Sequence, residues 1–250
     1  MTRIWRPSGW GVGVPLLDAP GKPVHYDRVD VVRERLRPAW MQTWTICDLP
    51  GVAPAWEFAT GELSLEEFAA INGKTALILN EPETGRVGPL SPHDAAVRTC
   101  NAVEYLSNAN VRFNWAAPNS NINGANLDWL AEYATALVSM GYLPTLWAIH
   151  IYGNKIEQVQ HHWQRFLRWY KDAGERRPVL VTEGGAGANA SSEEHLAMMG
   201  WLHTIMDNDP VVGVAYFASH SYVEGRRRYT GLLADPAMEE QWTRLRDIRR

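Results

Sequence analysis

Short apolar runs alternate with amphipathic segments along the chain, and this alternation defines the predicted elements. Nearly continuous apolar runs, typical of parallel strands buried on both faces, lie at residues 76–79, 146–151, 178–182 and 211–217. Less clear runs lie at residues 9–14, 39–46, 53–58 and 111–116, and the third of these is the weakest. The pattern therefore predicts eight strands with helices between them.

Several segments between these runs carry signals for the start of a helix. Ser64 and Ser191 are each followed three residues later by a glutamate, which is the pattern of a capping box. Ser91 stands directly before Pro92, a pair that favours a helix start. A stripe with helical spacing predicts one face packed against the sheet: Trp163, Phe166, Leu167 and Tyr170. Eight strands alternating with eight helices predict an α/β fold, a single (β/α)8 TIM barrel.

Composition supports a globular domain and excludes several classes of partner. The 250 residues have the length of such a barrel, and no repeat or linker divides them, so we expect one domain over residues 1–250. The 24 Lys and Arg against 28 Asp and Glu give no electrostatic basis for binding nucleic acid. No apolar run approaches the roughly 18 residues that a membrane span needs. We expect a monomer that binds neither nucleic acid nor membranes.

The sequence does not decide between a cytoplasmic and an extracellular location. The first residues lack the apolar region of a signal peptide, which indicates either a cytoplasmic protein or an extracellular one whose export signal has been removed. Cys47 and Cys100 form neither a zinc-binding spacing nor a disulfide framework. The histidines show no metal-ligand spacing, and no phosphate-binding loop or nucleophile elbow is present, so we expect no metal and no cofactor.

Two glutamates end predicted strands at the face where barrels carry their chemistry. Glu81 follows the fourth strand and Glu183 ends the seventh, so the two side chains converge from opposite sides of the barrel mouth. Cleavage of a glycosidic bond requires such a pair, one carboxyl protonated and the other ionised. If the pair cleaves with retention, its carboxyl carbons lie about 5–5.5 Å apart. Glu57 and Glu83 also lie near strand ends, and we expect them to be surface or supporting residues.

These motifs resemble clan A of the retaining glycoside hydrolases. Asn80-Glu81-Pro82 on the fourth strand and Thr182-Glu183-Gly184 on the seventh carry the resemblance, together with His150-Ile-Tyr152-Gly153 on the sixth. Their order is closest to the glycosyl hydrolase catalytic core family that includes family 128, the endo-β-1,3-glucanases. The resemblance implies a glycoside hydrolase catalytic domain in which Glu81 is the acid/base and Glu183 the nucleophile, acting on a polysaccharide or oligosaccharide.

Further residues fit roles in binding the sugar. The side-chain amide of Asn80 is placed to donate to the sugar 2-hydroxyl, and Tyr152 to hydrogen-bond Glu183 and hold it ionised. His150 either lines the same subsite or is a satisfied histidine of the barrel wall. The chain has 12 Trp, and an indole can stack on the C–H face of a sugar, so we expect Trp44 and Trp56 to line the cleft.

Departures from the family pattern leave the substrate open. Tyr216 stands where the family usually has a Trp at the floor of the subsite that holds the cleaved sugar. The run Arg226–Arg228 is either a solvated charge cluster or a sign of an acidic or highly substituted glycan. The prediction is therefore a retaining endo-glycosidase, with β-1,3-glucan favoured over cellulose, mannan or galactan. A barrel that binds glycans without cutting them is the alternative of a different class.

Overall fold

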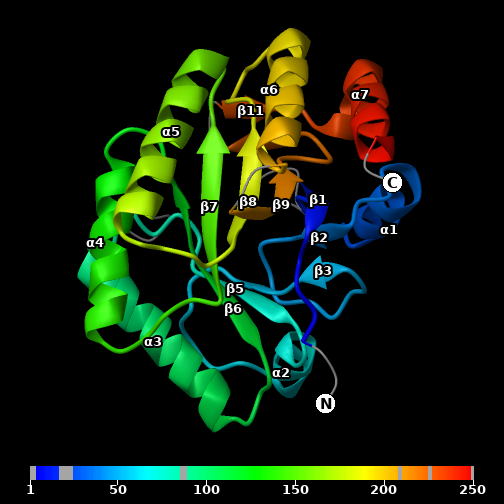
Figure 1. The fold of residues 1–250 in the computed structure, drawn as a ribbon. Coiled ribbons are helices and arrows are strands. Elements are labelled where there is room, and N and C mark those ends of the chain that lie inside the picture. Colours follow the sequence, from blue (N-terminus) through cyan, green and yellow to red (C-terminus); the bar gives the residue numbers. More distant parts are fainter. Residues whose placement is uncertain (1–3, 17–24, 85–88, 208–209, 225–226, 249–250) are drawn as a thin grey trace.

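The computed structural model describes residues 4–16, 25–84, 89–207, 210–224 and 227–248. Nine parallel strands form one sheet in the order β3-β2-β1-β9-β8-β7-β6-β5-β4 (Figure 1). The strands are β1 (Gly9–Gly13), β2 (Trp40–Gln42), β3 (Val52–Ala53), β4 (Ala55–Trp56), β5 (Thr75–Ile78), β6 (Asn114–Asn121), β7 (Leu146–Tyr152), β8 (Val179–Gly185) and β9 (Val211–Tyr216). All eight predicted strands are present within these nine.

The sheet closes into a barrel at Pro54. Segment β3 pairs with β2 and segment β4 pairs with β5, so the two ends of the strand order are one continuous stretch of chain. Proline has no backbone N–H and cannot donate to a strand ladder, which divides this barrel strand into two short pieces. The weakest run in the sequence is thus the place where the (β/α)8-type barrel closes.

Seven helices surround the barrel in the described part of the chain, one fewer than the sequence predicts. They are α1 (Asp27–Arg35), α2 (Leu65–Ile71), α3 (Pro92–Asn108), α4 (Asn126–Ser139), α5 (Ile156–Asp172), α6 (Ser192–Ile205) and α7 (Pro236–Asp247). The missing helix falls between β2 and β3, where Pro50 and Gly51 (φ 73°) interrupt a short connection. A hairpin of β10 (Tyr222–Glu224) and β11 (Arg227–Tyr229) and the 3₁₀ helix η1 (Leu232–Ala234) follow β9.

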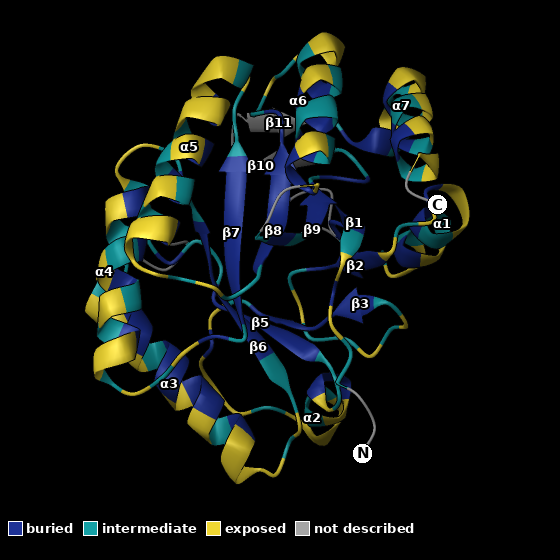
Figure 2. Cartoon of the chain, viewed as in Figure 1, coloured by how far each residue is buried: buried dark blue, intermediate teal, exposed yellow. Residues whose placement is uncertain are grey.

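The predicted helix starts are confirmed. Ser64 and Ser191 each accept a hydrogen bond from the backbone of the third helical residue, whose glutamate side chain accepts from the serine N–H. Ser91 accepts from the backbone N–H of Asp94. On α5 the aromatic stripe faces the sheet, with Trp163, Phe166 and Tyr170 buried. Figure 2 shows the same arrangement around the barrel, with buried strands inside and helices exposed on their outer faces.

The barrel interior is filled by Trp40 together with alanines and leucines of the surrounding strands. The ring of Trp40 is 1% exposed and lies in an interior cluster with small residues of facing strands, Ala116, Ala148 and Ala215 among them. A Cβ at Gly11 would lie 2.3 Å from the Trp40 ring, so this position accommodates no side chain. Because the interior is packed below, open space and polar side chains are left at the carboxyl ends of the strands.

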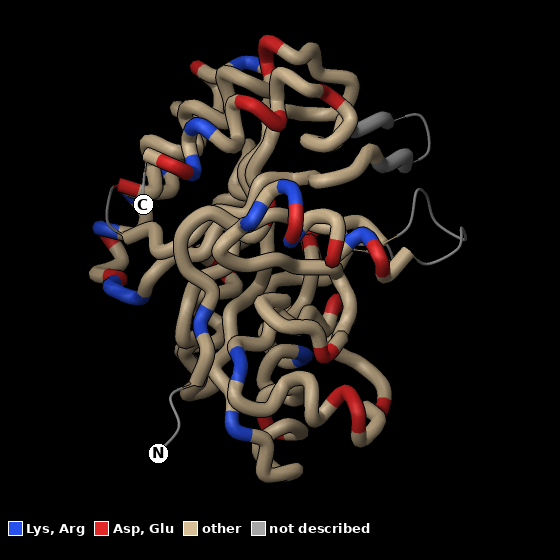
Figure 3. The backbone as a smooth tube through the Cα atoms, turned by 90° about the vertical axis from the view of Figure 1, so that its right-hand side faces the viewer, with Lys and Arg blue, Asp and Glu red and all other residues tan. Residues whose placement is uncertain are grey.

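Among the residues whose burial is described, Glu183 is the one Lys, Arg, Asp or Glu that is buried. Lysines and arginines are interspersed with acidic residues over the helices and loops in the view of Figure 3. Within the described ranges, no helix combines the length and apolarity that crossing a bilayer requires.

Helix α7 covers one side of the barrel through Trp242, and this contact gives a test of the fold. Trp242 is fully buried, its ring lies 5.2 Å from that of Trp10, and its Nε1 donates to the Leu36 carbonyl at 2.8 Å. We expect Trp242→Ala to lower the free energy of unfolding by about 3–5 kcal/mol, the usual cost of truncating a buried aromatic side chain. Chemical denaturation measures this.

The matched control is Leu65→Ala, another large-to-small change, at a residue that is 88% exposed. We expect that variant to stay within about 0.5 kcal/mol of wild type. Equal effects of the two substitutions would show that α7 is not part of the cooperative fold.

Candidate active site

A bulge in β8 directs Glu183 into the barrel mouth. The pairing of β7 with β8 runs from Ala148 with Leu180 and then skips Thr182, so that His150 pairs with Glu183. Ala148 and Leu180 face the interior, and strict alternation would therefore have placed Glu183 on the helix side. The Thr182 hydroxyl donates to the Ile149 carbonyl at 3.3 Å, which satisfies a backbone group at the irregularity. One extra residue thus places the carboxylate on the same face as His150.

Glu81 reaches the mouth by a different route. It follows β5, and its φ of 42° and the φ of 66° at Leu79 lie in the left-handed region that few non-glycine residues adopt. Asn119, with a φ of 55°, braces this turn: its side-chain amide donates to the Leu79 carbonyl at 2.7 Å, and its own carbonyl accepts from the Glu81 N–H at 3.0 Å. Left-handed non-glycine residues near a cleft mark strain that neighbouring contacts hold in place.

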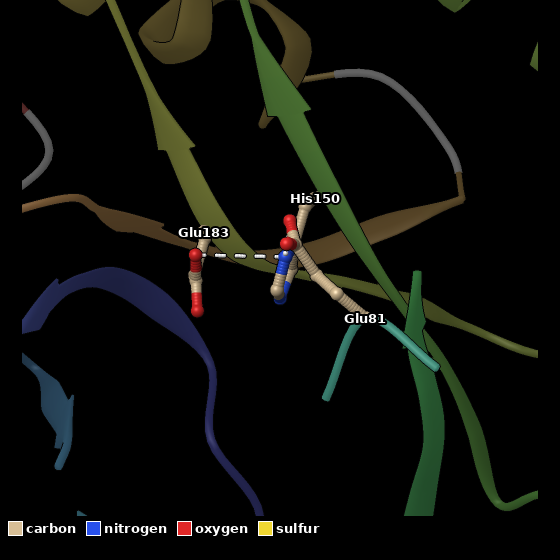
Figure 4. Close-up of side chains that lie close together, drawn as sticks. All are labelled: Glu81, His150 and Glu183. Carbon is tan, nitrogen blue, oxygen red and sulfur yellow. Dashed lines mark hydrogen bonds and ion pairs between the residues drawn. The ribbon is translucent and has the colours of Figure 1, made fainter. Parts of the chain in front are cut away.

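The two carboxylates and one imidazole meet at the mouth, as Figure 4 shows. His150 Nδ1 lies 3.0 Å from Glu81 Oε1 and 3.5 Å from Glu183 Oε2. One polar atom from each of the three residues lies within 4.8 Å of the others. The side chain of Glu81 is 30% exposed, whereas those of Glu183 and His150 are 8% and 0% exposed. The pair is therefore asymmetric, with one accessible and one enclosed carboxylate.

Aromatic side chains hold the enclosed carboxylate. The Tyr152 hydroxyl donates to Glu183 Oε2 at 2.6 Å, and Trp44 Nε1 donates to the other oxygen. Burial raises the pKa of Glu183, and the charge of Glu81 adds to this shift, while His150 and the two donors act in the opposite sense. Both oxygens of Glu183 thus have a donor that fixes the orientation of the carboxylate.

Glu81, His150 and Glu183 are also close enough together to hold a metal ion, and they are the group in the described part of the chain that is. Carboxylate oxygens and an imidazole nitrogen are ligands that several divalent cations accept. The Glu183 oxygens already accept hydrogen bonds from Tyr152 and Trp44, which suits a carboxylate positioned for proton transfer or nucleophilic attack.

Phe217, rather than Tyr216, presents its ring to the site. Tyr216 is fully buried on the helix side of β9, where its hydroxyl lies 2.7 Å from His195 Nδ1. The ring of Phe217 packs edge-on against Trp44 at 5.3 Å and Tyr152 at 5.8 Å. The placement of Tyr216 at a subsite floor is therefore wrong by one residue. Ala215 faces the barrel interior, and side chains on a strand alternate between its two faces, so Phe217, two residues on, faces the interior as well.

Trp56 also lies on the helix side of its strand and not in the cleft, because successive side chains on a strand point to opposite faces. Its ring is 7% exposed, lies 5.9 Å from that of Tyr105 in α3, and donates from Nε1 to the Thr60 carbonyl at 3.3 Å. Trp56 is thus a packing residue between β4 and the helices, and the expected stacking role is not supported. The next residue, Glu57, lines the barrel mouth instead.

Of the other residues predicted from the sequence, Trp44, Asn80 and Tyr152 lie at the barrel mouth and Glu83 lies behind it. Trp44 and Asn80 line the mouth together, and Tyr152 lies beside Glu183. Glu83 accepts from the Asn121 N–H at 2.7 Å, and burial raises its pKa, so it is a supporting residue as expected. The side chains of the Arg226–Arg228 run lie outside the described residues, and neither reading of that run is tested.

A parallel barrel with two converging glutamates at its carboxyl-terminal mouth defines a class of protein, the glycoside hydrolases built on this fold. The sequence matches the family described as glycosyl hydrolase catalytic core over residues 51–243. The chain belongs to this family and is a glycoside hydrolase. No curated protein sequence matches the chain.

Solved structures of family 128 share the fold at low sequence identity. The endo-β-1,3-glucanase of Amycolatopsis mediterranei (subgroup I), in complex with laminaritriose, has a TM-score of 0.68 and 17% identity, covering 96% of this chain and 100% of that one. The endo-β-1,3-glucanase of Sorangium cellulosum (subgroup II) gives 0.64 and 18%, covering 95% and 97%. The curdlan-specific exo-β-1,3-glucanase of Blastomyces gilchristii (subgroup III) gives 0.65 and 17%, covering 92% and 96%.

The imidazole between the carboxylates gives a prediction for pH titration. Burial disfavours the charged form of His150, but Glu183 and Glu81 outweigh it and raise the pKa of the imidazole. We expect NMR of the ring nitrogens to show a pKa above that of an ordinary histidine, and Glu183→Gln to lower it by removing one negative charge. A pKa that does not respond to this substitution would contradict the interpretation.

The same shift has a consequence for stability, with a definite sign. A pKa raised on folding means that the folded state binds the proton more tightly than the unfolded state. The contribution of His150 is then fully present below the unfolded pKa and is lost as the pH rises through the folded pKa. We expect His150→Gln to flatten this part of the stability profile, measured by denaturation at a series of pH values.

Proposed function

We propose that this protein is a retaining endo-hydrolase of β-1,3-glucan, with Glu183 as nucleophile and Glu81 as acid/base, in one catalytic domain. The observation that carries the proposal is the asymmetry of two carboxylates whose nearest oxygens lie within 4.8 Å. The enclosed carboxylate of Glu183, held by two donors, suits direct attack on the anomeric carbon, and the accessible carboxylate of Glu81 suits proton transfer to the leaving oxygen.

The surroundings of the two glutamates support the assignment of roles. A nucleophile must be ionised and fixed in orientation: Tyr152 and Trp44 both donate to Glu183, and with His150 they oppose the rise in its pKa that burial causes. An acid/base must reach the leaving oxygen and later a water, and Glu81 is the more exposed of the two. The hydrogen bond between His150 and Glu81 Oε1 orients that carboxyl toward the cleft.

The reaction then proceeds in two displacements. Glu183 attacks the anomeric carbon while Glu81 donates its proton to the glycosidic oxygen, and the reducing-end fragment leaves. Glu81, now ionised, takes a proton from a water that attacks the same carbon and releases Glu183. The indole N–H of Trp44 and the phenol of Tyr152 keep the Glu183 oxygens in place during both steps.

The substrate is proposed from the structural relatives. The three family 128 structures above are described as β-1,3-glucanases, two of them endo-acting and one exo-acting. Release of reducing ends from laminarin, curdlan, cellulose, mannan and galactan tests the linkage, and the length of the first products separates endo from exo action. Binding of laminari-oligosaccharides without any cleavage would instead favour a glycan-binding barrel, for which the carboxylate pair has no evident use.

The nucleophile is tested with Glu183→Ala. We expect the rate on laminarin to fall by more than about 10⁴-fold, because the covalent step is lost. Added azide can occupy the vacated space and attack the face that Glu183 attacks, so the product is a glycosyl azide of inverted configuration. Glu62→Ala, at an exposed carboxylate, is the control that retains activity. Unchanged turnover in Glu183→Ala would exclude this residue from the mechanism.

The acid/base is tested with Glu81→Ala and substrates that differ in leaving group. We expect rates with polysaccharide to fall by about 10²–10⁴-fold and rates of the first step with activated aryl glycosides to change little, because a good leaving group departs without protonation. The glycosyl-enzyme then accumulates, and azide gives a product of retained configuration. If azide gives the opposite configurations in the two variants, the roles of Glu81 and Glu183 are exchanged.

A further inference from the structure

An open groove lies on the helix side of the barrel wall, separate from the mouth. Its volume is about 590 Å³, which is within the range of ligand-binding sites. Strand β4 divides the two spaces: Trp56 lines the groove, whereas its chain neighbours Ala55 and Glu57 line the mouth. A ligand in the groove therefore occupies a different surface from the substrate at the two glutamates.

One face of α3 forms the longest wall of this groove. Helix α2 lies on this side of α3 but has 7 residues against 17, and its Phe68 packs against Tyr105 at the far end of the face, with the rings 5.5 Å apart. The shortness of α2 leaves the groove beside the earlier turns of α3. The groove-lining residues of α3 have the spacing of a single helix face: Asp94, Val97, Arg98, Asn101, Ala102 and Tyr105.

One end of the groove lies at the rim of the barrel mouth. Because α3 follows β5, its first turn lies at the carboxyl end of the strands, where Glu81 lies as well. Thr60, three residues after Glu57, lines the groove from the connection after β4. Leu90 lines it from the segment after Glu81, and its N–H donates to the Pro82 carbonyl at 2.8 Å. A long polymer bound in the mouth is therefore within reach of the groove.

Three polar side chains on the α3 face offer both donors and acceptors. Asp94 and Asn101 are exposed, and Arg98 is half-buried. Within the described part of the chain, neither Arg98 nor Asn101 forms a side-chain hydrogen bond or ion pair, so their polar atoms are available to a ligand. One carboxylate balances one guanidinium, so the groove has no excess charge that would select an ion. This row suits a neutral ligand with many hydroxyls, since a hydroxyl both donates and accepts.

Apolar surface lies among these polar groups. Val97 is 37% exposed, and Leu90 and Tyr105 are half-buried. A sugar ring can pack a C–H face on such side chains while the hydroxyls at its edge reach the polar row. The three polar residues are four and three positions apart, so they are spaced by about 6 and 4.5 Å along the helix axis, close to the length of one sugar unit. Successive units of a glycan chain then meet successive polar residues.

We propose that this groove is a second polysaccharide-binding site, which holds a segment of the same neutral glycan chain that occupies the mouth. Continuity with the mouth argues for this occupant, because a polymer bound at the glutamates has a high effective concentration at a site just beyond the rim. The choice of β-1,3-glucan as the probe rests on the proposed function. A peptide is the competing occupant of a groove with this composition.

The double variant Arg98→Ala/Asn101→Ala tests the groove through the length of the substrate. We expect KM on laminarin to rise about five- to tenfold with kcat unchanged, because a polymer held at two sites binds more tightly than one held at a single site. An aryl laminaribioside is short enough to be held by the mouth alone, so its kcat and KM stay at the wild-type values. Equal losses on the two substrates, or no change on either, would overturn the proposal.

The matched control is Gln164→Ala/Arg168→Ala, which removes one amide and one guanidinium from the exposed face of α5. We expect this variant to keep the wild-type KM on laminarin. An equal rise of KM in both double variants would show a general effect of surface substitutions, and it would contradict a binding site in the groove.

Binding without turnover separates this inference from the proposed function. Electrophoresis of Glu183→Gln through gels that contain laminarin, mannan or galactan measures affinity for each polymer. We expect laminarin to retard this variant, and the added groove substitutions to lower the association constant about tenfold.

The two proposals fail in different ways. If the wild type cleaves none of the polysaccharides but the groove substitutions still weaken retention by one of them, the groove assignment stands and the hydrolase proposal fails. If the wild type cleaves laminarin and the groove substitutions change neither retention nor KM, the hydrolase stands and the glycan site is overturned, with a peptide as the remaining class of occupant.

Discussion

Each barrel strand places alternate residues in the barrel interior and in the helix layer, and the arrangement of the site depends on this constraint. Ala148, His150 and Tyr152 follow the interior face of β7 in steps of two. The helix-facing residues between them, Ile149 and Ile151, are fully buried and anchor the strand in the outer core. Because the outer core holds the strand in register, the imidazole and the phenol project into the mouth, where they contact the two glutamates.

The site also depends on departures from this alternation. The bulge at Thr182 turns Glu183 inward, and the left-handed residues Leu79 and Glu81 redirect the chain after β5. Both irregularities are compensated locally, by the Thr182 hydroxyl and by the Asn119 amide. Regular strands supply rigidity, and the local irregularities at their carboxyl ends supply the convergence that two carboxylates need.

The two sides of the mouth have different chemical characters. Around Glu183, the aromatic rings of Trp44, Tyr152 and Phe217 enclose the carboxylate and leave it little access to water. On the side of β2, β4, β5 and β6, a small pocket next to Asn80 combines polar residues such as Gln42 and Glu57 with apolar ones such as Leu77. A glycan ring has apolar C–H faces and a polar rim of hydroxyls, so one site that offers both kinds of surface matches its chemistry.

The sequence by itself determined the eight-strand barrel, the helix starts and the candidate carboxylates. Apolar runs and capping serines are local signals, and Asn-Glu-Pro and Thr-Glu-Gly stand at the ends of two such runs. It did not determine which aromatic ring faces the cleft: Trp56 and Tyr216 were expected there, but their neighbours Glu57 and Phe217 occupy the positions. Nor did it show the bulge at Thr182 or the missing helix after β2. A one-residue change of register inverts the face on which a side chain lies, and that register is set by pairing with neighbouring strands, so only the tertiary structure decided it.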